Sequence, residues 1–424
     1  MNDLRNALAL GREIAARRLT AVKVLEAALA RIEARDNEIL AWKLINPEQA
    51  LAEAMARDAE EPKGPLHGVP VGVKDVLDTS DIATGYGSAI YEGALPSADA
   101  AAVANLRASG MVVLGKTVTT EFAMRFPGAT RNPNNLAHTP GGSSSGSAAA
   151  VADGHVPLAI GTQTSGSVIR PASYCGVIGF KPSWGAVPRA GLKMLAESLD
   201  TIGTMANSAA DAEAFALALA GRPINPTAPL DQPPRIGICR TVAWPNIEHA
   251  GSRGLEEAAT CAAAAGAKVV DVQLPEPFAT ALEAHDVVMT YESRGMLAFE
   301  CDRHWDRLSP ALQDVMKRGM NHDWPAYQSA LANRRACRKS LADAFQDVDI
   351  LLTPSALGEA PKGLSFTGSP DFNRIWTFVG APSITVPGLM GPNGLPVGTQ
   401  LIAPLGQDSR VIGAAGWLQN LLQA

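Results

Sequence analysis

The sequence predicts an α/β protein, and three observations support this fold class. Segments with apolar residues at helical spacing alternate with short apolar runs along most of the chain. Forty-six per cent of the residues are hydrophobic and 18% are charged, which is typical of a globular chain with a sizeable core. The length of 424 residues suffices for one large domain or for about two to three smaller ones.

The expected elements follow from these patterns. Helical spacing predicts helices at 2–60, at 98–109 with Gly110 as the stop, from 148 onward, at 254–265 and over most of 277–346. Short apolar runs predict strands at 69–73, 111–114, 158–160, 236–239, 268–272, 350–352, 383–386 and 397–402. Residues 128–147 are mostly Gly, Pro, Asn and Ser and predict a loop.

The best candidate for a linker is the segment 222–234, which contains five prolines. It could separate two domains. Apolar strands on both sides of it look like parts of one sheet, so we expect a single domain over residues 1–424 with a proline-rich surface connection.

Composition excludes several classes of protein. The net charge of −6 argues against nucleic-acid binding. Five cysteines without CxxC spacing argue against structural metal and disulfide frameworks and favour the cytoplasm. No apolar run reaches the ~18 residues of a membrane span, and the first residues resemble an amphipathic helix rather than a signal peptide. We also expect a small-molecule substrate and no cofactor, and leave a homodimer open as the assembly.

One motif suggests nucleotide binding. Residues 110–117 match the pattern GxxxxGK[ST], but their four variable positions are Met-Val-Val-Leu. A phosphate-binding loop needs an irregular turn there and a helix directly after it. We interpret the segment as a helix stop followed by a buried strand.

Two serines and a lysine indicate nucleophilic chemistry. Ser143 lies in Gly-Gly-Ser-Ser-Ser-Gly-Ser (141–147), and Ser167 lies in Gly-Thr-Gln-Thr-Ser-Gly-Ser (161–167). A serine needs a base, and Lys74 ends the apolar run 68–73. Burial could lower its pKa from ~10.4 to about 7–8, as a base requires. An ordinary exposed lysine is the alternative. No histidine has a familiar triad context, although His67 and His138 flank the motifs.

The glycine-rich segments admit two interpretations. Consecutive N–H groups over 164–167 could converge on one oxyanion. A flexible linker is the alternative, but apolar runs flank both segments.

These motifs resemble those of the amidase signature family over nearly the whole chain. Besides the two serine segments, 24 residues apart from Ser143 to Ser167, further matches lie at 64–70, 115–117, 121–123, 175–182, 198–200, 380–382 and 394–400. The resemblance implies one domain with a large twisted mixed β-sheet covered by helices. It also implies a serine amidase acting on linear amides through an acyl-enzyme.

The resemblance implies roles residue by residue. Ser167 would be the nucleophile, Lys74 the base, and Ser143, after a cis peptide bond, the bridge between them. The N–H groups of Thr164, Ser165, Gly166 and Ser167 would form the oxyanion hole. Gln163 and Ser165 depart from the family's usual Asp and Gly, so a salt bridge would be lost and a Cβ added beside that hole.

Arg170 is the substrate clue. It stands three residues after Ser167, where most of the family places an arginine two residues after, and this spelling is similar to malonamidase-type members. In an extended segment the shift would turn the guanidinium to the opposite face, into the pocket. Arginine binds carboxylates bidentately, so a small carboxylated amide such as malonamate would fit. A structural ion pair is the alternative.

Three other functions remain open. The chain could be the amidase (glutaminase) subunit of a tRNA-dependent amidotransferase, although it lacks a basic stripe. It could be an aryl- or indoleacetamide-type amidase. It could also be a non-catalytic scaffold, which the presence of Lys74, Ser143 and Ser167 disfavours.

Overall fold

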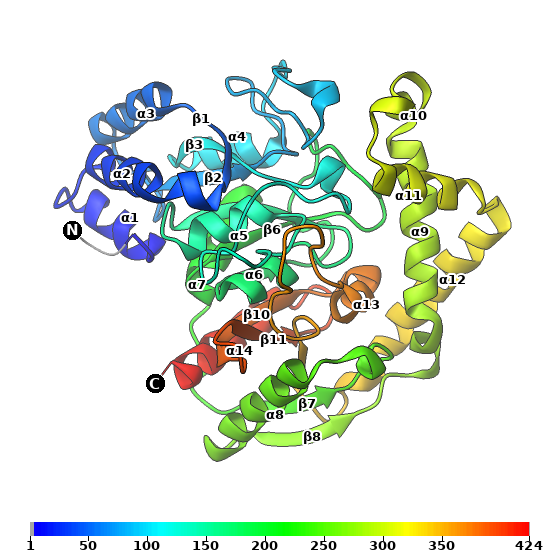
Figure 1. Cartoon of the computed structure of the whole chain (residues 1–424). Helices are drawn as coiled ribbons and strands as arrows, with labels where there is room; N and C mark the ends of the chain where they lie inside the picture. Colours follow the sequence, from blue (N-terminus) through cyan, green and yellow to red (C-terminus); the bar gives the residue numbers. More distant parts are fainter. Residues whose placement is uncertain (1–3, 424) are drawn as a thin grey trace.

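A computed structural model describes residues 4–423 of the protein. The fold is organised around a mixed β-sheet (Figure 1). Within these residues the sheet has 11 strands in the order β1-β3-β2-β4-β6-β5-β10-β11-β9-β7-β8. The strands are β1 (Trp42–Ile45), β2 (Pro70–Lys74), β3 (Val112–Thr117), β4 (Leu158–Gln163), β5 (Ile178–Lys181), β6 (Thr201–Ala206), β7 (Arg235–Cys239), β8 (Lys268–Val272), β9 (Ile350–Pro354), β10 (Ser383–Met390) and β11 (Pro396–Ile402). Parallel pairs lie toward both ends, and antiparallel pairs form the centre.

Fourteen α-helices surround this sheet in the described part of the chain. They are α1 (Ala7–Ala15), α2 (Ala21–Ile39), α3 (Pro47–Ala59), α4 (Ala101–Ala108), α5 (Ser145–Ala152), α6 (Ile169–Cys175), α7 (Ala209–Leu219), α8 (His249–Ala264), α9 (Ala281–Met296), α10 (Ala298–Arg303), α11 (Pro310–Met320), α12 (Trp324–Ser340), α13 (Asp371–Val379) and α14 (Asp408–Leu422). Figure 1 shows α1–α3 at one end of the molecule and α9–α12 along the opposite side.

The alternation of side chains along β4 explains how the sheet holds helices on both faces. Leu158 and Ile160 belong to the large core cluster that includes residues of α7 and α14. Ala159, between them, packs in a smaller cluster with residues of α5 and α6. Because successive side chains of a strand point to opposite faces, α5 and α6 cover one face and α7 and α14 the other. The two serine motifs therefore belong to the same face of the sheet.

The structure confirms the α/β class and the predicted strands, with boundaries that differ by a few residues. It corrects two expectations. Residues 2–60 are not continuously helical, because β1 lies between α2 and α3 and pairs with β3. The predicted loop 128–147 ends early, since α5 already begins at Ser145. Strands on both sides of residues 222–234 join one sheet, while the single-domain assignment stays a prediction.

The segment 110–117 has the strand geometry expected from its apolar residues. Val112–Thr117 form β3, between β1 and β2. Gly110 has a φ of 83°, as suits the residue after a helix, and a Cβ at Gly115 would lie 2.3 Å from the Leu44 carbonyl oxygen of β1. Turn and packing requirements thus explain both glycines of the motif.

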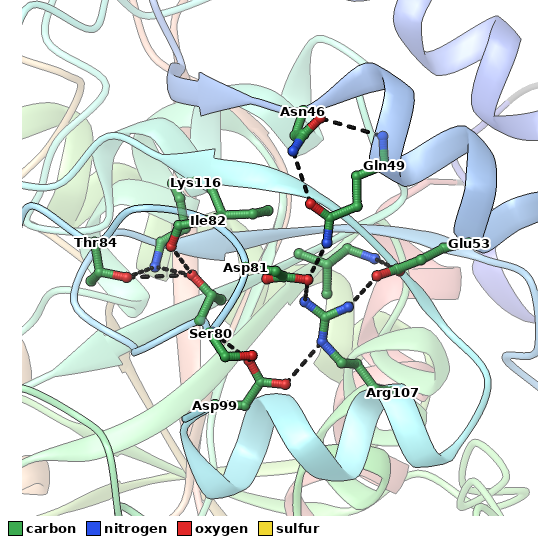
Figure 2. A network of polar contacts seen from close by, with 12 residues as sticks. Asn46, Gln49, Glu53, Ser80, Asp81, Ile82, Thr84, Asp99, Arg107 and Lys116 are labelled. Carbon is green, nitrogen blue, oxygen red and sulfur yellow. Dashed lines mark hydrogen bonds and ion pairs between the residues drawn. The ribbon is translucent and has the colours of Figure 1, made fainter. Parts of the chain in front are cut away.

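A polar network beside β3 joins α3 and α4 to the loop after β2 (Figure 2). Arg107 of α4 donates to Glu53 of α3, and its guanidinium lies 2.6 Å from Asp81 and 3.0 Å from Asp99. Lys116 of β3 appears in the same view, where it donates to Thr84 at 2.7 Å. This network ties α3 and α4 to the loop that follows β2, the strand that carries Lys74.

Candidate active site

Lys74 is the last residue of β2, and its side chain is fully buried. Its Nζ lies 2.8 Å from Ser143 Oγ and 2.8 Å from Thr162 Oγ1. Burial lowers the Lys74 pKa to about 7, and the negative charge of Asp200 acts in the opposite direction. A large share of Lys74 is therefore uncharged at neutral pH and able to accept a proton.

The sheet brings these groups together because β2 and β4 are parallel neighbours. Their carboxyl ends lie at the same edge, where Lys74 ends β2 and the loop with Ser167 follows β4. Ser143 reaches the same place from the turn that enters α5, and its peptide bond with Gly142 is cis, as the family resemblance predicted. Three segments that are distant in sequence thus converge on one point.

Ser167 lines the same cavity as Ser143 and is 8% exposed. Within residues 4–423 its hydroxyl makes no hydrogen bond, so the direct bond to Ser143 expected of a bridging serine is not formed in this structure. No described acceptor competes for this hydroxyl, which lies in the cavity wall without a hydrogen-bond partner among residues 4–423.

The two departures from the family's loop sequence are accommodated locally. Gln163 is fully buried, and its Oε1 accepts hydrogen bonds from the N–H groups of Val168 and Ile169 at 2.9 and 3.1 Å. Its Nε2 donates to Thr377 Oγ1 at 2.9 Å. Ser165 places its hydroxyl 3.4 Å from the sulfur of Met289. A neutral amide therefore supports the loop at 163, and the hydroxymethyl group at 165 contacts Met289.

Arg170 does not lie in an extended segment, which corrects the premise of the sequence argument. It is the second residue of α6, 5% exposed, and it lines the cavity. Its guanidinium donates to the carbonyl oxygens of Gly368 and Gly142 at 2.9 and 2.6 Å and to Thr367 Oγ1 at 3.3 Å. It makes no ion pair within the described residues, and its Nε is buried without a partner.

The cavity at these residues has a volume of about 300 Å³. Its wall includes Ser143, Thr164, Ser165, Ser167, Arg170, Met289, Phe366 and Pro370. The other charged residues of the wall are Arg125, Arg374, Asp286 and Asp371. His67 and His138 are not part of the wall. Their rings contact the carbonyl oxygens of Arg57 and Ala360 instead. The exposed lining is therefore more apolar than polar, and its polar groups include serines, arginines and two carboxylates, with the buried Lys74 bonded to Ser143 of the wall.

Comparison with known proteins identifies the family. A family model described as Amidase matches residues 23–412. The chain belongs to the amidase family. The A subunit of the glutamyl-tRNA(Gln) amidotransferase of Acidothermus cellulolyticus is 34% identical, with 98% of this chain and 94% of that protein covered. The corresponding protein of Koribacter versatilis is 32% identical, with 96% of each covered.

Solved structures give the same result. A crystal structure of an amidase has a TM-score of 0.90 at 30% identity and covers 98% of this chain and 99% of its own. The peptide amidase of Stenotrophomonas maltophilia has a TM-score of 0.84 at 30% identity, with 99% and 97% covered. This amidase is therefore a serine hydrolase that acts on amide C–N bonds.

The structure adds residues that the sequence motifs did not reveal. His285, Asp286 and Met289 come from α9, and Arg374 and Thr377 come from α13. Both helices approach the loop after β4 only in the folded amidase. No local pattern marks these residues, because α9 lies in a long helical region without a motif and α13 follows an irregular segment.

Asp200 is the other titratable group near Lys74. It is buried after the motif Ser-Leu-Asp at 198–200 and accepts hydrogen bonds from Thr164 Oγ1 at 2.5 Å and Leu195 N at 2.6 Å. Burial raises the Asp200 pKa to about 6. Its carboxylate is thus ionised at neutral pH and holds Thr164 in place.

Within residues 4–423, no group of three or more His, Cys, Asp or Glu side chains is arranged to hold a metal ion. No helix among the same residues has the length and apolar character that a membrane crossing requires.

Proposed function

We propose that this amidase cleaves a small linear amide through an acyl ester on Ser167, with Lys74 as the base and Ser143 as the proton bridge. The observation that carries the proposal is the 2.8 Å contact between the buried, pKa-lowered Lys74 Nζ and Ser143 Oγ, beside a Ser167 hydroxyl in the same cavity. This arrangement offers a base, a relay and a nucleophile without histidine.

The proposed reaction needs one proton path, used in both directions. Ser167 Oγ attacks the amide carbonyl carbon and gives its proton to Ser143, which passes its own to Lys74 Nζ. The path then reverses, the leaving nitrogen takes the proton, and the C–N bond breaks. Water cleaves the ester by the same path and releases the carboxylic acid. A separation of 2.8 Å between Nζ and Oγ permits transfer in either direction.

The substrate we propose carries a carboxylate near its amide, as malonamate does. Arg170 supports this, because it is a buried cation of the cavity wall without a carboxylate partner in the described chain. Burial lowers its pKa to about 10, so it stays charged at neutral pH. Arg125 is a second, exposed cation of the wall, and no described residue pairs with it. A substrate carboxylate would supply the missing counter-charge.

Ammonia release from matched carboxylated and neutral amides tests both the proposed nucleophile and the proposed carboxylate-binding role of Arg170. Ser167→Ala should abolish release from every amide, and turnover retained in that variant would remove the nucleophile assignment. Arg170→Ala should raise KM for carboxylated amides while sparing neutral ones. The neutral amides control for the loss of the bonds from Arg170 to Gly142 and Gly368, so equal losses on both classes would exclude the carboxylate role.

A second candidate function is the amidase component of a tRNA-dependent amidotransferase, which the names of the relatives favour. The placement of Arg170 and the net charge of −6 support the free-standing amidase instead. Purification of the chain from its own cells distinguishes them. Co-purifying subunits with glutamine-dependent transfer would support the second function, and an active chain alone would support the first. An aryl-amide specificity would appear as faster ammonia release from aryl amides in the same assay.

We further propose a cytoplasmic enzyme, consistent with the five cysteines, all of which are free in the structure. A homodimer remains a prediction, which solution scattering tests by measuring the mass of the particle.

A further inference from the structure

Three consecutive peptide groups after β4 have their carbonyl oxygens held by other parts of the protein. The Thr164 oxygen lies 2.9 Å from His285 Nε2, and the Ser165 oxygen lies 2.8 Å from Thr377 Oγ1. The Gly166 oxygen accepts from the N–H of Arg170 at 2.9 Å. The carbonyls of this loop are therefore fixed one after another by α9, α13 and α6.

The N–H groups of the same three peptides are free. In a trans peptide the N–H points opposite to the C=O, and the cis bond of the described chain lies elsewhere, at Gly142. The amides that follow the held carbonyls are those of Ser165, Gly166 and Ser167, and within residues 4–423 none donates a hydrogen bond. Thr164, Ser165 and Ser167 line the cavity, whereas His285 and Thr377 do not. The free donors thus face the cavity side.

The contacts of His285 define its tautomer. Arg374 Nε, which can only donate, lies 3.2 Å from His285 Nδ1. Nδ1 is therefore the acceptor, and Nε2 carries the proton that it donates to the Thr164 oxygen. Burial, and then the charge of Arg374, lower the pKa of this fully buried imidazole well below its usual value. The ring is a neutral donor with one orientation.

Arg374 is in turn held in place. Its guanidinium lies 3.6 Å from Asp286 and 3.5 Å from Asp371, and it donates to the Leu282 oxygen at 2.9 Å. Its positive charge is thus balanced, and it orients His285 without attracting substrate anions strongly.

Thr377 is oriented in a comparable way. Gln163 Nε2 donates to Thr377 Oγ1 at 2.9 Å, so the threonine hydroxyl must direct its own proton elsewhere. The Ser165 oxygen at 2.8 Å is the shorter of its two carbonyl contacts, the other being Asn373 O at 3.1 Å.

We propose that His285 and Thr377 are positioning residues for the oxyanion site of this amidase, acting through the peptide groups that they hold from behind. The inference rests on the proposed function, in which Ser167 attacks an amide carbonyl. As negative charge develops on the substrate oxygen, donors that are already fixed stabilise it without reorganisation. A hydrogen bond accepted by a peptide oxygen also polarises the N–H of the same peptide.

The test compares the variants His285→Leu and His285→Gln. Leucine removes the donor, whereas the amide Nε2 of glutamine can replace it. Loss of a direct oxyanion donor costs about 10²–10³-fold in kcat, so loss of its support should cost about 10–100-fold. We expect this loss in His285→Leu with KM nearly unchanged, and substantial recovery in His285→Gln. An aldehyde inhibitor that forms a tetrahedral adduct on Ser167 should lose affinity by a similar factor.

Thr377→Val provides an independent variant if His285→Leu does not fold. It should lower kcat and aldehyde affinity in the same pattern. Thr204→Val is the matched control, because Thr204 Oγ1 also donates to a buried carbonyl, Ala212 O at 2.8 Å. This bond joins β6 to α7, the helix on the sheet face opposite α5 and α6. This control should lose stability and keep kcat.

Wild-type kcat in both His285→Leu and Thr377→Val, or a glutamine variant as slow as the leucine variant, would overturn the inference. A loss confined to KM would do the same. These outcomes are separate from failure of the proposed function, which would appear as turnover in Ser167→Ala whatever the His285 variants do.

Discussion

Lys74 and Lys116 are buried lysines on neighbouring parallel strands, yet their surroundings differ in kind. Both are fully buried, on β2 and β3. Lys116 has a carboxylate partner, Asp75 at 3.8 Å, and binds the Leu77 oxygen and the hydroxyls of Thr79 and Thr84, next to the network of Figure 2. Among the described residues, Lys74 binds two hydroxyls and no carboxylate, and one of these hydroxyls lines the cavity. The same residue type thus serves as a structural cation in one place and as a candidate base in the other.

Bonding partners distinguish these lysines better than the pKa does. Burial lowers the pKa of Lys116 to about 8 and those of Lys74 and Lys181 to about 7. Lys181 binds the carbonyl oxygen of Pro182 and does not line the cavity that contains Ser143 and Ser167. A lowered pKa therefore does not single out the base, but a hydroxyl relay that opens to the cavity does.

The largest effect is expected for Lys74→Met. Removal of a positioned base should reduce kcat/KM by about 10³-fold, with the fold retained, because no described charge depends on Lys74 as an ion-pair partner. Ammonia release measures kcat/KM, and circular dichroism measures whether the fold is retained.

The same variant tests the pH dependence of stability. Between pH 7 and about 10, Lys74 of the unfolded wild-type chain binds a proton that Lys74 of the folded chain lacks. The free energy of unfolding of the wild type should therefore rise with pH in this range more than that of Lys74→Met.

Lys116→Met should give the opposite pattern. It leaves the buried Asp75 carboxylate unpaired, which costs about 3–5 kcal/mol of unfolding free energy. Urea titration measures this loss, and active-site titration corrects kcat for the folded fraction. A folded Lys116→Met enzyme as inactive as Lys74→Met would break the distinction between the two lysines.

The smallest effect concerns the pH profile. Since Lys74 must be neutral to accept a proton, kcat/KM should rise with pH through about 7. The Asp200 charge raises the Lys74 pKa, so Asp200→Asn should move this rise to lower pH. Asp408→Asn is the control, because Asp408 acts on Lys181, and its profile should match that of the wild type. An Asp200→Asn profile shifted to higher pH would contradict the assignment.

Much of the fold could be predicted because its signals are local. The apolar runs at 69–73 and 268–272 marked β2 and β8, and the motifs around Ser143 and Ser167 marked the serine loops. The apolar residues in 110–117 distinguished a strand from a phosphate-binding loop.

The rest depends on contacts between distant segments. The strand β1 is short and partly exposed, and it exists through its pairing with β3. The sequence argument for Arg170 held only for an extended backbone, whereas the segment is helical, with the Gln163 side chain accepting hydrogen bonds from N–H groups at the start of α6. His285 lies 121 residues from Thr164, so no local pattern could relate them.

The most direct test of the central claim is a titration of Lys74 itself. Nuclear magnetic resonance of lysine labelled at the ε-carbon follows each ammonium group, and the signal that disappears in Lys74→Met identifies Lys74. The account predicts that this signal titrates near pH 7 and that the same inflection governs acylation of Ser167. A Lys74 that stays protonated above pH 9 while the enzyme is fully active would contradict it.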